Sequence, residues 1–483
     1  MIMKMQFLSR KCLLILAALL PPLVSAAEPR VWNVADLSRF TTTLKVLVAE
    51  PRVWNVAYDK ESPLDVAVSI LIEEINTPSA QPSFGSLKKI YGNSYTSVPA
   101  IRKTTAQLNG LRMGVEEKEA KFYPKVTLQT NFGQSTVDNV NSKASDQAST
   151  TTLAAEQLLY DFGATANEIA VARTRLASGV DKAAAERLNV LLSMLTAQLE
   201  LQTAKKMIVF YDSNEKSRQQ FFDLIQEKVN LGASSQLDLA RANTKLLEAK
   251  AKIPAMAGEL FRTESAVQEF FGQVPEFTFA FYQLPDIPVN FGGNIDTVVS
   301  RHPLSLEASK NVAASLQEFE YMKSALFGRV SLKLSVSGSR QPFTGNTNTT
   351  SGFIEYSNTL FDGFAQRARI AVAREKAVEF EIEQERIERK VRQQLLKTLA
   401  EYHSAKETLE IREKLLISAR KSARDLYTAF LLNTGSLTDI FDAEESYFTA
   451  AESTLNAMTS LHRAYYKLLH DAGQLSNAFE LNS

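Results

Sequence analysis

Residue types that commonly carry catalysis or bind metals are sparse in this chain of 483 residues. Its histidines show no metal-ligand spacing with one another, and Cys12 is the only cysteine. The sequence has neither a glycine-rich phosphate loop nor a Gly-x-Ser-x-Gly turn. Because 54 Lys and Arg balance 54 Asp and Glu, no basic field favours nucleic acid. We therefore expect no enzyme, no cofactor, no bound metal and no nucleic-acid partner. The histidines are His302, His403, His462 and His470.

The N-terminus has the pattern of an export signal. It combines a basic start, an apolar stretch over residues 12–20 and small residues up to Ala27. A membrane anchor is the alternative, but the stretch is shorter than the ~20 residues that span a bilayer. We expect a signal peptide over residues 1–27, whose removal would take away the only thiol.

Residues 28–98 follow as an N-terminal extension with a possible helix. The segment 27–35 recurs at 49–57, and the two copies hold both tryptophans of the chain. A neutral duplication in a tolerant terminus is the simplest explanation.

A much longer internal repeat organises the rest of the chain. Residues 99–273 and 294–475 form the two repeats, and Pro99 aligns with Pro303 just as Asp238 aligns with Asp439. Each repeat is expected to contain a helix, a β-hairpin, a very long helix and a further helix. Residues 274–293 form the linker between them, and residues 476–483 form a C-terminal tail.

Apolar and polar residues in the second repeat alternate with the period of a β-strand. One apolar face suits lipid and one polar face suits water, whereas a soluble hairpin packed on one face is the alternative. We expect return strands near 151–160 and 352–361, after exposed polar loops at 135–149 and 342–350. The predicted lipid-facing residues are Val330, Leu332, Leu334 and Val336.

Two segments lack helix breakers over unusual lengths. Residues 165–231 contain no proline and one glycine, and residues 365–431 contain neither, so each predicts a helix of roughly 100 Å. Such helices must lie along partners, although an ordinary antiparallel bundle would also satisfy them. One heptad seam marks the second segment, and two stripes mark the first, which predicts neighbours on two sides. The seam is Leu395, Tyr402, Leu409 and Leu416, and the stripes are Leu188 with Leu195 and Met194 with Leu201 and Ile208.

Two hairpins supply too few strands to close a barrel within one chain. In lipid, the unpaired N–H and C=O groups of the sheet edges would cost several kcal/mol each. Several copies must therefore join, and hydrogen bonding alone predicts a homo-oligomer.

Paired motifs give the chain a family resemblance over roughly residues 99–475. The strands open at Tyr123-Pro124 and Phe327-Gly328, the hairpins end in Leu-aromatic-Asp at 159–161 and 360–362, and helical tips follow at 231–239 and 432–440. Each of these motifs occurs once in each repeat and in the same order. In this respect the chain resembles the TolC-like outer-membrane efflux and secretion proteins. The resemblance implies an α+β membrane protein with two internal repeats per chain, whose long α-helical barrel is continuous with an oligomeric transmembrane β-barrel. It also implies a homotrimer in the cell outer membrane, with a tunnel in the periplasm, a periplasmic adaptor (membrane fusion protein) and an inner-membrane transporter.

The same resemblance implies a gate at the periplasmic tips of the helices. By motif position its acidic residues are Asp439 and Asp442, with Asp238 as the first-repeat counterpart, and symmetry would repeat each carboxylate around the axis. The alternative is that Asp238 and Asp439 only cap the helices that follow the turns. The tip turns contain Gly232, Asn433 and Gly435, and Gly435 stands where the family has a basic partner, so closure is expected to rest on helix packing.

These observations predict a passive outer-membrane exit duct of a tripartite export system, driven by an inner-membrane pump. Its cargo is secreted protein or small molecules. The family resemblance is somewhat closer to members that serve type I protein secretion than to drug-efflux members, chiefly in the ends of the β-hairpins at 161–163 and 362–364. The alternative is a non-channel periplasmic or surface coiled-coil protein. A hydrolase on an unusual scaffold is a third interpretation, which the missing motifs disfavour.

Overall fold

The computed structural model describes residues 63–76, 98–139, 142–272, 284, 294–341, 345–431 and 435–478. All of these belong to one of two compact units of the chain, Glu61–Ser483. The predicted signal peptide, the duplicated segment and nearly all of the predicted linker lie outside the described residues.

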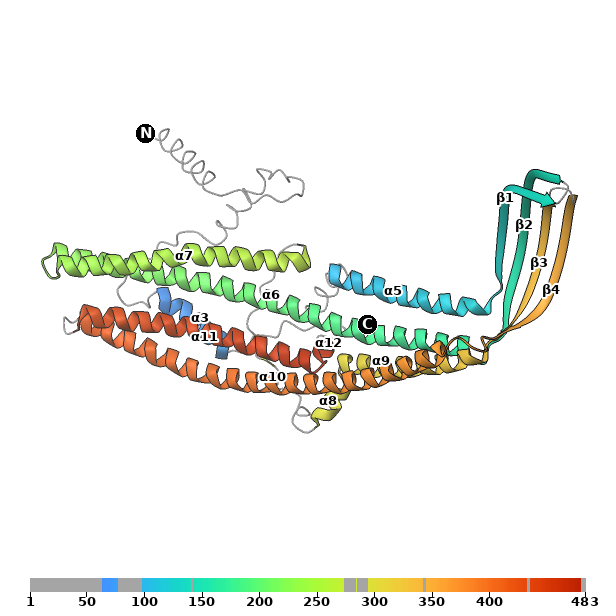
Figure 1. Ribbon diagram of the computed structural model, residues 1–483. Helices are drawn as coiled ribbons and strands as arrows, with labels where there is room; N and C mark the ends of the chain where they lie inside the picture. The colour runs from blue at the N-terminus through green and yellow to red at the C-terminus, as the bar shows by residue number, and fades with distance from the viewer. Residues whose placement is uncertain are drawn as a thin grey trace, which may run out of the picture. The chain divides into compact units, whose positions relative to one another are not determined.

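Long helices and the strands of a single sheet alternate along the chain (Figure 1). The elements are α3 Pro63–Asn76, α5 Pro99–Glu119, η1 Ala120–Phe122, β1 Lys125–Asn139, β2 Ser142–Tyr160, α6 Ala164–Asn230, α7 Gln236–Phe271, α8 Ile295–Arg301, α9 Pro303–Ser324, η3 Ala325–Phe327, β3 Arg329–Gln341, β4 Gly345–Ser357, α10 Ala365–Leu431, α11 Leu437–Asp471 and α12 Leu475–Ala478. The order α5-η1-β1-β2-α6-α7 is followed by the same order from α9 to α11.

The helices α6 and α10 are each 67 residues long, within one residue of the bounds predicted from the missing helix breakers. At the start of α6 the carboxylate of Asp161 accepts hydrogen bonds from the backbone N–H of Gly163 (3.2 Å) and Thr165 (2.6 Å). These bonds satisfy N–H groups that have no partner inside the helix.

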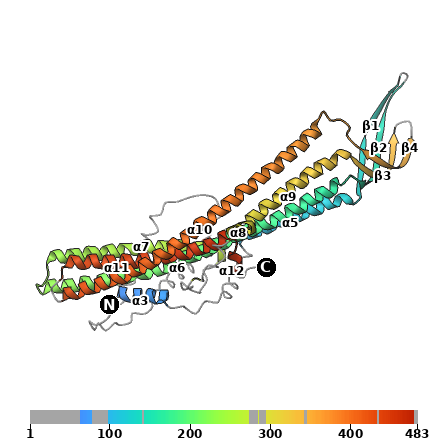
Figure 2. The ribbon, with the colours of Figure 1, turned by 90° about the horizontal axis from the view of Figure 1, so that it is seen from below.

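Two antiparallel helical hairpins, α6 with α7 and α10 with α11, pack against each other through α6 and α11 (Figures 1 and 2). We call them the first and the second helical hairpin. Helices α5 and α9 run beside α6 in the half of that helix nearer the sheet, and α9 also contacts α10.

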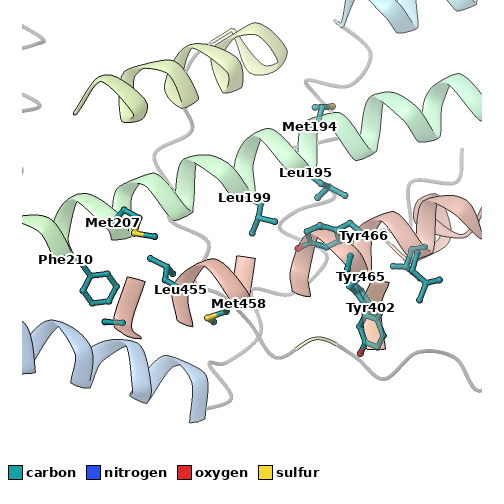
Figure 3. Packing of buried hydrophobic residues seen from close by; sticks show 14 of the residues in the cluster. Met194, Leu195, Leu199, Met207, Phe210, Tyr402, Leu455, Met458, Tyr465 and Tyr466 are labelled. Carbon is teal, nitrogen blue, oxygen red and sulfur yellow. The ribbon is translucent and has the colours of Figure 1, made fainter. Parts of the chain in front are cut away.

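The main hydrophobic core lies between α6 and the second helical hairpin. Figure 3 shows Leu199 of α6 directed toward α11, and Tyr402 of α10 beside Tyr465 of α11. The ring centroids of the two tyrosines are 6.1 Å apart. The predicted heptad seam is confirmed as a packed stripe, because Leu395, Tyr402 and Leu416 are buried in this core and Leu409 packs against it. The two predicted stripes of α6 are also packed. Leu188, Met194 and Leu195 belong to the main core, while Leu201 is buried against Leu260 and Val267 of α7 with Ile208 beside it.

The four strands form one antiparallel sheet in the order β1-β2-β3-β4. In the register of β3 and β4, Leu332 lies opposite Ile354 and Leu334 lies opposite Gly352. The segment is thus a regular strand, in which the predicted apolar and polar residues alternate between the two faces. Thus Val330, Leu332, Leu334 and Val336 share one face, because residues two apart point to the same side. The opposite face is polar, with Lys333 donating to Glu355 at 2.6 Å.

The predicted polar loops of the β-hairpins were wrong in their bounds. Strand β1 continues to Asn139 and β2 begins at Ser142, so most of the predicted loop 135–149 is strand. Strand β4 begins at Gly345, within the predicted loop 342–350, and ends at Ser357, before the predicted end at residue 361. The error has a physical reason: Ser and Thr on a solvated extension fit a pleated strand and hydrogen-bond across it, so their polarity did not mark a turn.

Each passage from sheet to long helix contains a phenylalanine with left-handed backbone, Phe162 with φ 56° and Phe364 with φ 70°. Such conformations cost free energy in a residue other than glycine. Aromatic packing offsets the cost, because the Phe162 ring lies 4.9 Å from Tyr160 and the Phe364 ring 5.4 Å from Phe361.

No helix among the described residues is long and apolar enough to cross a membrane.

Candidate functional site at the helical tips

The turns that end α6 and α10 bring most of the predicted site residues to the tips of the two helical hairpins, at the end opposite the sheet (Figures 1 and 2). Gly232 and Asp238 belong to the first tip, while Gly435, Asp439 and Asp442 belong to the second. Asn433 lies outside the described residues.

Gly232 closes the first tip with left-handed backbone, φ +74°. Its N–H donates to Val229 O at 3.0 Å, and the next N–H, of Ala233, donates to Lys228 O at 2.7 Å. This pattern satisfies the last carbonyls of α6, and glycine adopts it without steric cost.

Asp238 is tied into the start of α7. Its carboxylate accepts hydrogen bonds from the Ser235 N–H (3.2 Å), the Ser235 hydroxyl (2.7 Å) and the Ser234 hydroxyl (3.1 Å). The Ser235 hydroxyl in turn accepts from the Asp238 N–H at 3.1 Å, which completes a capping box. The Ser235 hydroxyl is the main cause that lowers the pKa of Asp238. This geometry favours the capping interpretation for Asp238.

Gly435 lies against the end of α10, where its N–H donates to Ala429 O at 3.1 Å. A Cβ atom at this position would stand 2.9 Å from the backbone N of Phe430, too close for any side chain without a shift of the backbone. This close approach of the backbone is the physical reason for a glycine at position 435.

Asp439 and Asp442 lie on the exposed side of the first turns of α11, while Ile440 and Phe441 between them are buried. Three residues apart on a helix, the two carboxylates share a face. The structure gives no hydrogen bond or ion pair to either carboxylate from the residues it describes. The second tip therefore presents two solvated negative charges, whereas the first tip uses its aspartate internally.

An aromatic cluster that sequence reasoning missed joins the hairpins just behind the tips. Phe221 of α6 packs on Phe430 of α10 and Phe441 of α11, with ring centroids 5.8 and 5.3 Å away. Ile225 and Ile440 are fully buried in the same cluster. The signal available in the sequence was the grouping of aromatic residues near the end of each long helix.

A buried ion pair lies farther from the tips and was also missed. The guanidinium of Arg218 is almost fully buried; it donates to Glu444 at 2.7 Å and to Glu445 at 3.4 Å. Burial raises the pKa of Glu444, and the charge of Arg218 opposes that shift. The pair joins α6 of the first helical hairpin to α11 of the second.

No group of three or more His, Cys, Asp or Glu residues within the described ranges is arranged to hold a metal ion. The chemistry of the tips is consequently that of charge, helix capping and apolar packing.

Comparison with known proteins agrees with the family resemblance of the sequence. A family model described as outer membrane efflux protein matches residues 91–273. Over these residues the chain is similar to outer membrane efflux proteins, in agreement with the family resemblance of its paired motifs. The family is one of efflux conduits, and its location is the cell outer membrane, with the helical part in the periplasm.

Two curated relatives match over most of their length. The chain is 18% identical over 389 residues to the outer membrane efflux protein BepC of Brucella suis, covering 77% of this chain and 84% of BepC. It is 20% identical over 391 residues to the protein CyaE of Bordetella pertussis, covering 79% of this chain and 82% of CyaE.

A solved structure shows the same fold. The CmeC outer membrane channel of Campylobacter jejuni superposes with a TM-score of 0.70 at 11% identity, covering 94% of each chain. At this identity the likeness concerns the fold, an arrangement of long helices and a small antiparallel sheet.

Proposed function

We propose that this efflux-family chain is the exit duct of a tripartite export system, a passive outer-membrane channel assembled from three copies. An inner-membrane transporter supplies the energy, and a periplasmic adaptor joins it to the helical tips. The observation that carries the proposal is the four-stranded sheet, which has one apolar face, one polar face and two edges that pair with no other described strand.

The two faces of the sheet suit different solvents. On one face, large apolar side chains are left uncovered by the rest of the chain, with Leu128 exposed to 71% and Ile354 to 70%. On the other face Ser335 and Ser351 lie 2.7 Å apart, in hydrogen-bond contact, beside the Lys333–Glu355 ion pair. Lipid outside and water inside would satisfy both faces.

The edges of the sheet require other copies. Among the described residues, strands β1 and β4 each have one neighbouring strand, so the second edge of each lacks backbone partners there. Pairing β4 of one copy with β1 of the next would close a barrel, and the family resemblance implies that three copies do so.

The helices support the same assembly. The surface of α10 carries apolar residues that nothing else in the described chain covers, among them Val372, Ile382 and Ile411. Neighbouring copies would bury them and continue the wall of helices into a periplasmic tunnel. The twofold order of elements within the chain supports the predicted internal repeat, in which each half contributes one β-hairpin and one helical hairpin.

The gate is proposed at the second tip. Asp439 and Asp442 are exposed and lack partners among the described residues, so symmetry would make of them rings of negative charge that attract cations. With glycine at position 435, no basic side chain from that position can neutralise them, and the aromatic cluster around Phe221 supplies the closing contacts instead.

Fractionation tests the proposal against the non-channel coiled-coil alternative. We expect a heat-modifiable oligomer in the detergent-extracted outer membrane. Release of the protein by osmotic shock would support the periplasmic coiled coil instead. For the cargo, we expect export of either a protein or a set of small molecules to fail when the gene is deleted and to return with the wild-type gene.

A further inference from the structure

The short helix α3 packs on the two helical hairpins at once. It lies against α6 and α11 (Figures 1 and 2). Ser217, which it contacts on α6, is 13 residues before the end of that helix at Asn230, so α3 is docked about 20 Å from the tips.

The apolar side of α3 is part of the main core. Leu64, Ala67 and Val68 are buried there, at the spacing of one helical face, while Val66 and Ile70 are exposed. Helix α3 thus contributes side chains to the same core that holds α6 against α11.

Asp65 and Ser69 make polar contacts between α3 and the second helical hairpin. The Asp65 carboxylate is the centre of these contacts. It accepts a hydrogen bond from Arg420 Nε of α10 at 3.0 Å and from the Tyr447 hydroxyl of α11 at 2.9 Å. The Arg420 Nη2 also donates to the Ser69 hydroxyl at 2.9 Å. On the other side, the Leu64 N–H donates to the Ser217 hydroxyl of the first helical hairpin at 3.3 Å.

The buried pair of Arg218 and Glu444 crosses between the hairpins in the same region, and the Asp65 charge is close enough to contribute to the raised pKa of Glu444. One ion pair therefore joins the first helical hairpin to the second, and the pair of Asp65 with the half-buried Arg420 joins α3 to the second helical hairpin. A helix of 14 residues is marginal by itself, so α3 depends on its packing and on these polar contacts for its place.

We propose that α3 is a clasp that fixes the second helical hairpin against the first, so that the tip widens only after the contacts of Asp65 break. This inference rests on the proposed function, in which movement of the tip controls passage. The Asp65 carboxylate is buried and Arg420 is half-buried, so removing either partner costs the clasped arrangement more stability than removing an exposed pair would.

Single-channel recording of the full-length oligomer in a planar bilayer tests the clasp. Asp65→Ala and Arg420→Ala should each raise the open fraction roughly tenfold or more. The double variant should add little to either, because both residues act in one contact. The milder Tyr447→Phe removes the hydrogen bond to Asp65 and keeps the ion pair, so it should shift the open fraction in the same direction by less. The control is Arg386→Ala on the same helix α10, which removes an exposed pair with Glu383 and should leave the open fraction unchanged.

A distance measurement tests the clasp without relying on conduction. Spin labels at Leu247→Cys of α7 and Ser446→Cys of α11, two exposed positions, report the separation of the hairpins in a chain with Cys12→Ser. Labelled chains are diluted with unlabelled ones so that distances within one chain dominate. Asp65→Ala should lengthen or broaden the distance distribution while the helical circular dichroism of the protein is kept.

The outcomes separate the two proposals. A wild-type protein that does not conduct contradicts the proposed function, and the label distances still decide on the clasp. Conduction by the wild type with the same open fraction and the same distances in Asp65→Ala and Tyr447→Phe would overturn the clasp alone.

Discussion

Arg218 of α6 donates a hydrogen bond to Glu444 of α11 at 2.7 Å and so joins the two helical hairpins of one chain through a buried charge. An arginine this deeply buried in the chain is stable only with its partner, since an uncompensated ion in the interior costs several kcal/mol.

Replacement of Arg218 should therefore destabilise the helical part strongly. We expect Arg218→Ala to lower the free energy of unfolding by about 3–5 kcal/mol, measured by urea unfolding followed by circular dichroism. The matched control is Arg262→Ala, which breaks an exposed pair with Glu259 on α7 and should cost less than about 1 kcal/mol. Equal effects of the two substitutions would contradict the importance of the buried pair.

Stability should depend on pH through His302, which precedes α9 and accepts a hydrogen bond from the Leu304 N–H. Burial lowers the pKa of His302 to about 4, with the nearby His470 acting in the same direction. In the unfolded chain the His302 imidazole takes up a proton near pH 6.5, its ordinary pKa, whereas in the folded chain it does so only near pH 4. Neutral His302 therefore makes its full contribution to the free energy of unfolding above about pH 6.5. That contribution falls by about 3 kcal/mol as the pH drops to 4.

The measurement is the free energy of unfolding at several pH values between these limits for the wild type and for His302→Gln. The variant should lose most of the dependence in this window. The exposed His403 provides the control, because His403→Gln should keep the wild-type slope. A slope that survives in His302→Gln would assign the pH dependence to other groups.

The second tip should determine ion selectivity. We expect Asp439→Ala with Asp442→Ala to reduce cation selectivity or to change conductance in a bilayer, because the carboxylates act by charge alone. Asp238→Ala should instead cost about 1 kcal/mol of stability through the lost capping box and leave selectivity nearly unchanged. Unchanged conductance and selectivity in the double variant would remove the gate assignment.

A charged side chain on the apolar face of the sheet should hinder assembly into the membrane. Leu334→Lys is expected to impair assembly into the outer membrane, since a lysine on a lipid-facing strand costs about 2–4 kcal/mol at mid-membrane. Ser335→Lys places the same side chain on the polar face and should assemble. If Leu334→Lys assembles and Ser335→Lys does not, the faces have been assigned the wrong way round.

The turn at Gly435 should be intolerant of side chains. Gly435→Ala places a Cβ atom 2.9 Å from the Phe430 N, and we expect the second tip to lose protection from a protease. Gly110→Ala in α5 meets nothing within 4 Å and should be neutral or slightly stabilising. Equal protection of both variants would show that this turn tolerates a backbone shift.

The sequence was most informative where local chemistry alone decides the structure. The absence of helix breakers predicted the bounds of α6 and α10 to within one residue. The seven-residue period of Leu395, Tyr402 and Leu416 identified a packed stripe. The alternation at Leu332 and Leu334 predicted a face of the sheet in the same way.

Contacts between distant positions were not predictable. Asp65 meets Arg420 and Tyr447 across 355 and 382 positions of sequence, and nothing in the local pattern of α3 indicates either partner. The ends of the strands were missed because Ser and Thr suit both solvated strands and loops. At Gly435 the sequence showed that a basic residue was missing, whereas the close approach of Phe430 gives the physical reason.

The most direct test of the central claim is the native mass of the full-length protein extracted from the outer membrane in detergent. Closure of β1 against β4 between copies predicts an oligomer, which the family resemblance implies has three chains, and this complex should survive extraction and fall apart on heating. A protein that stays a single chain in water without detergent would contradict both the barrel and the duct.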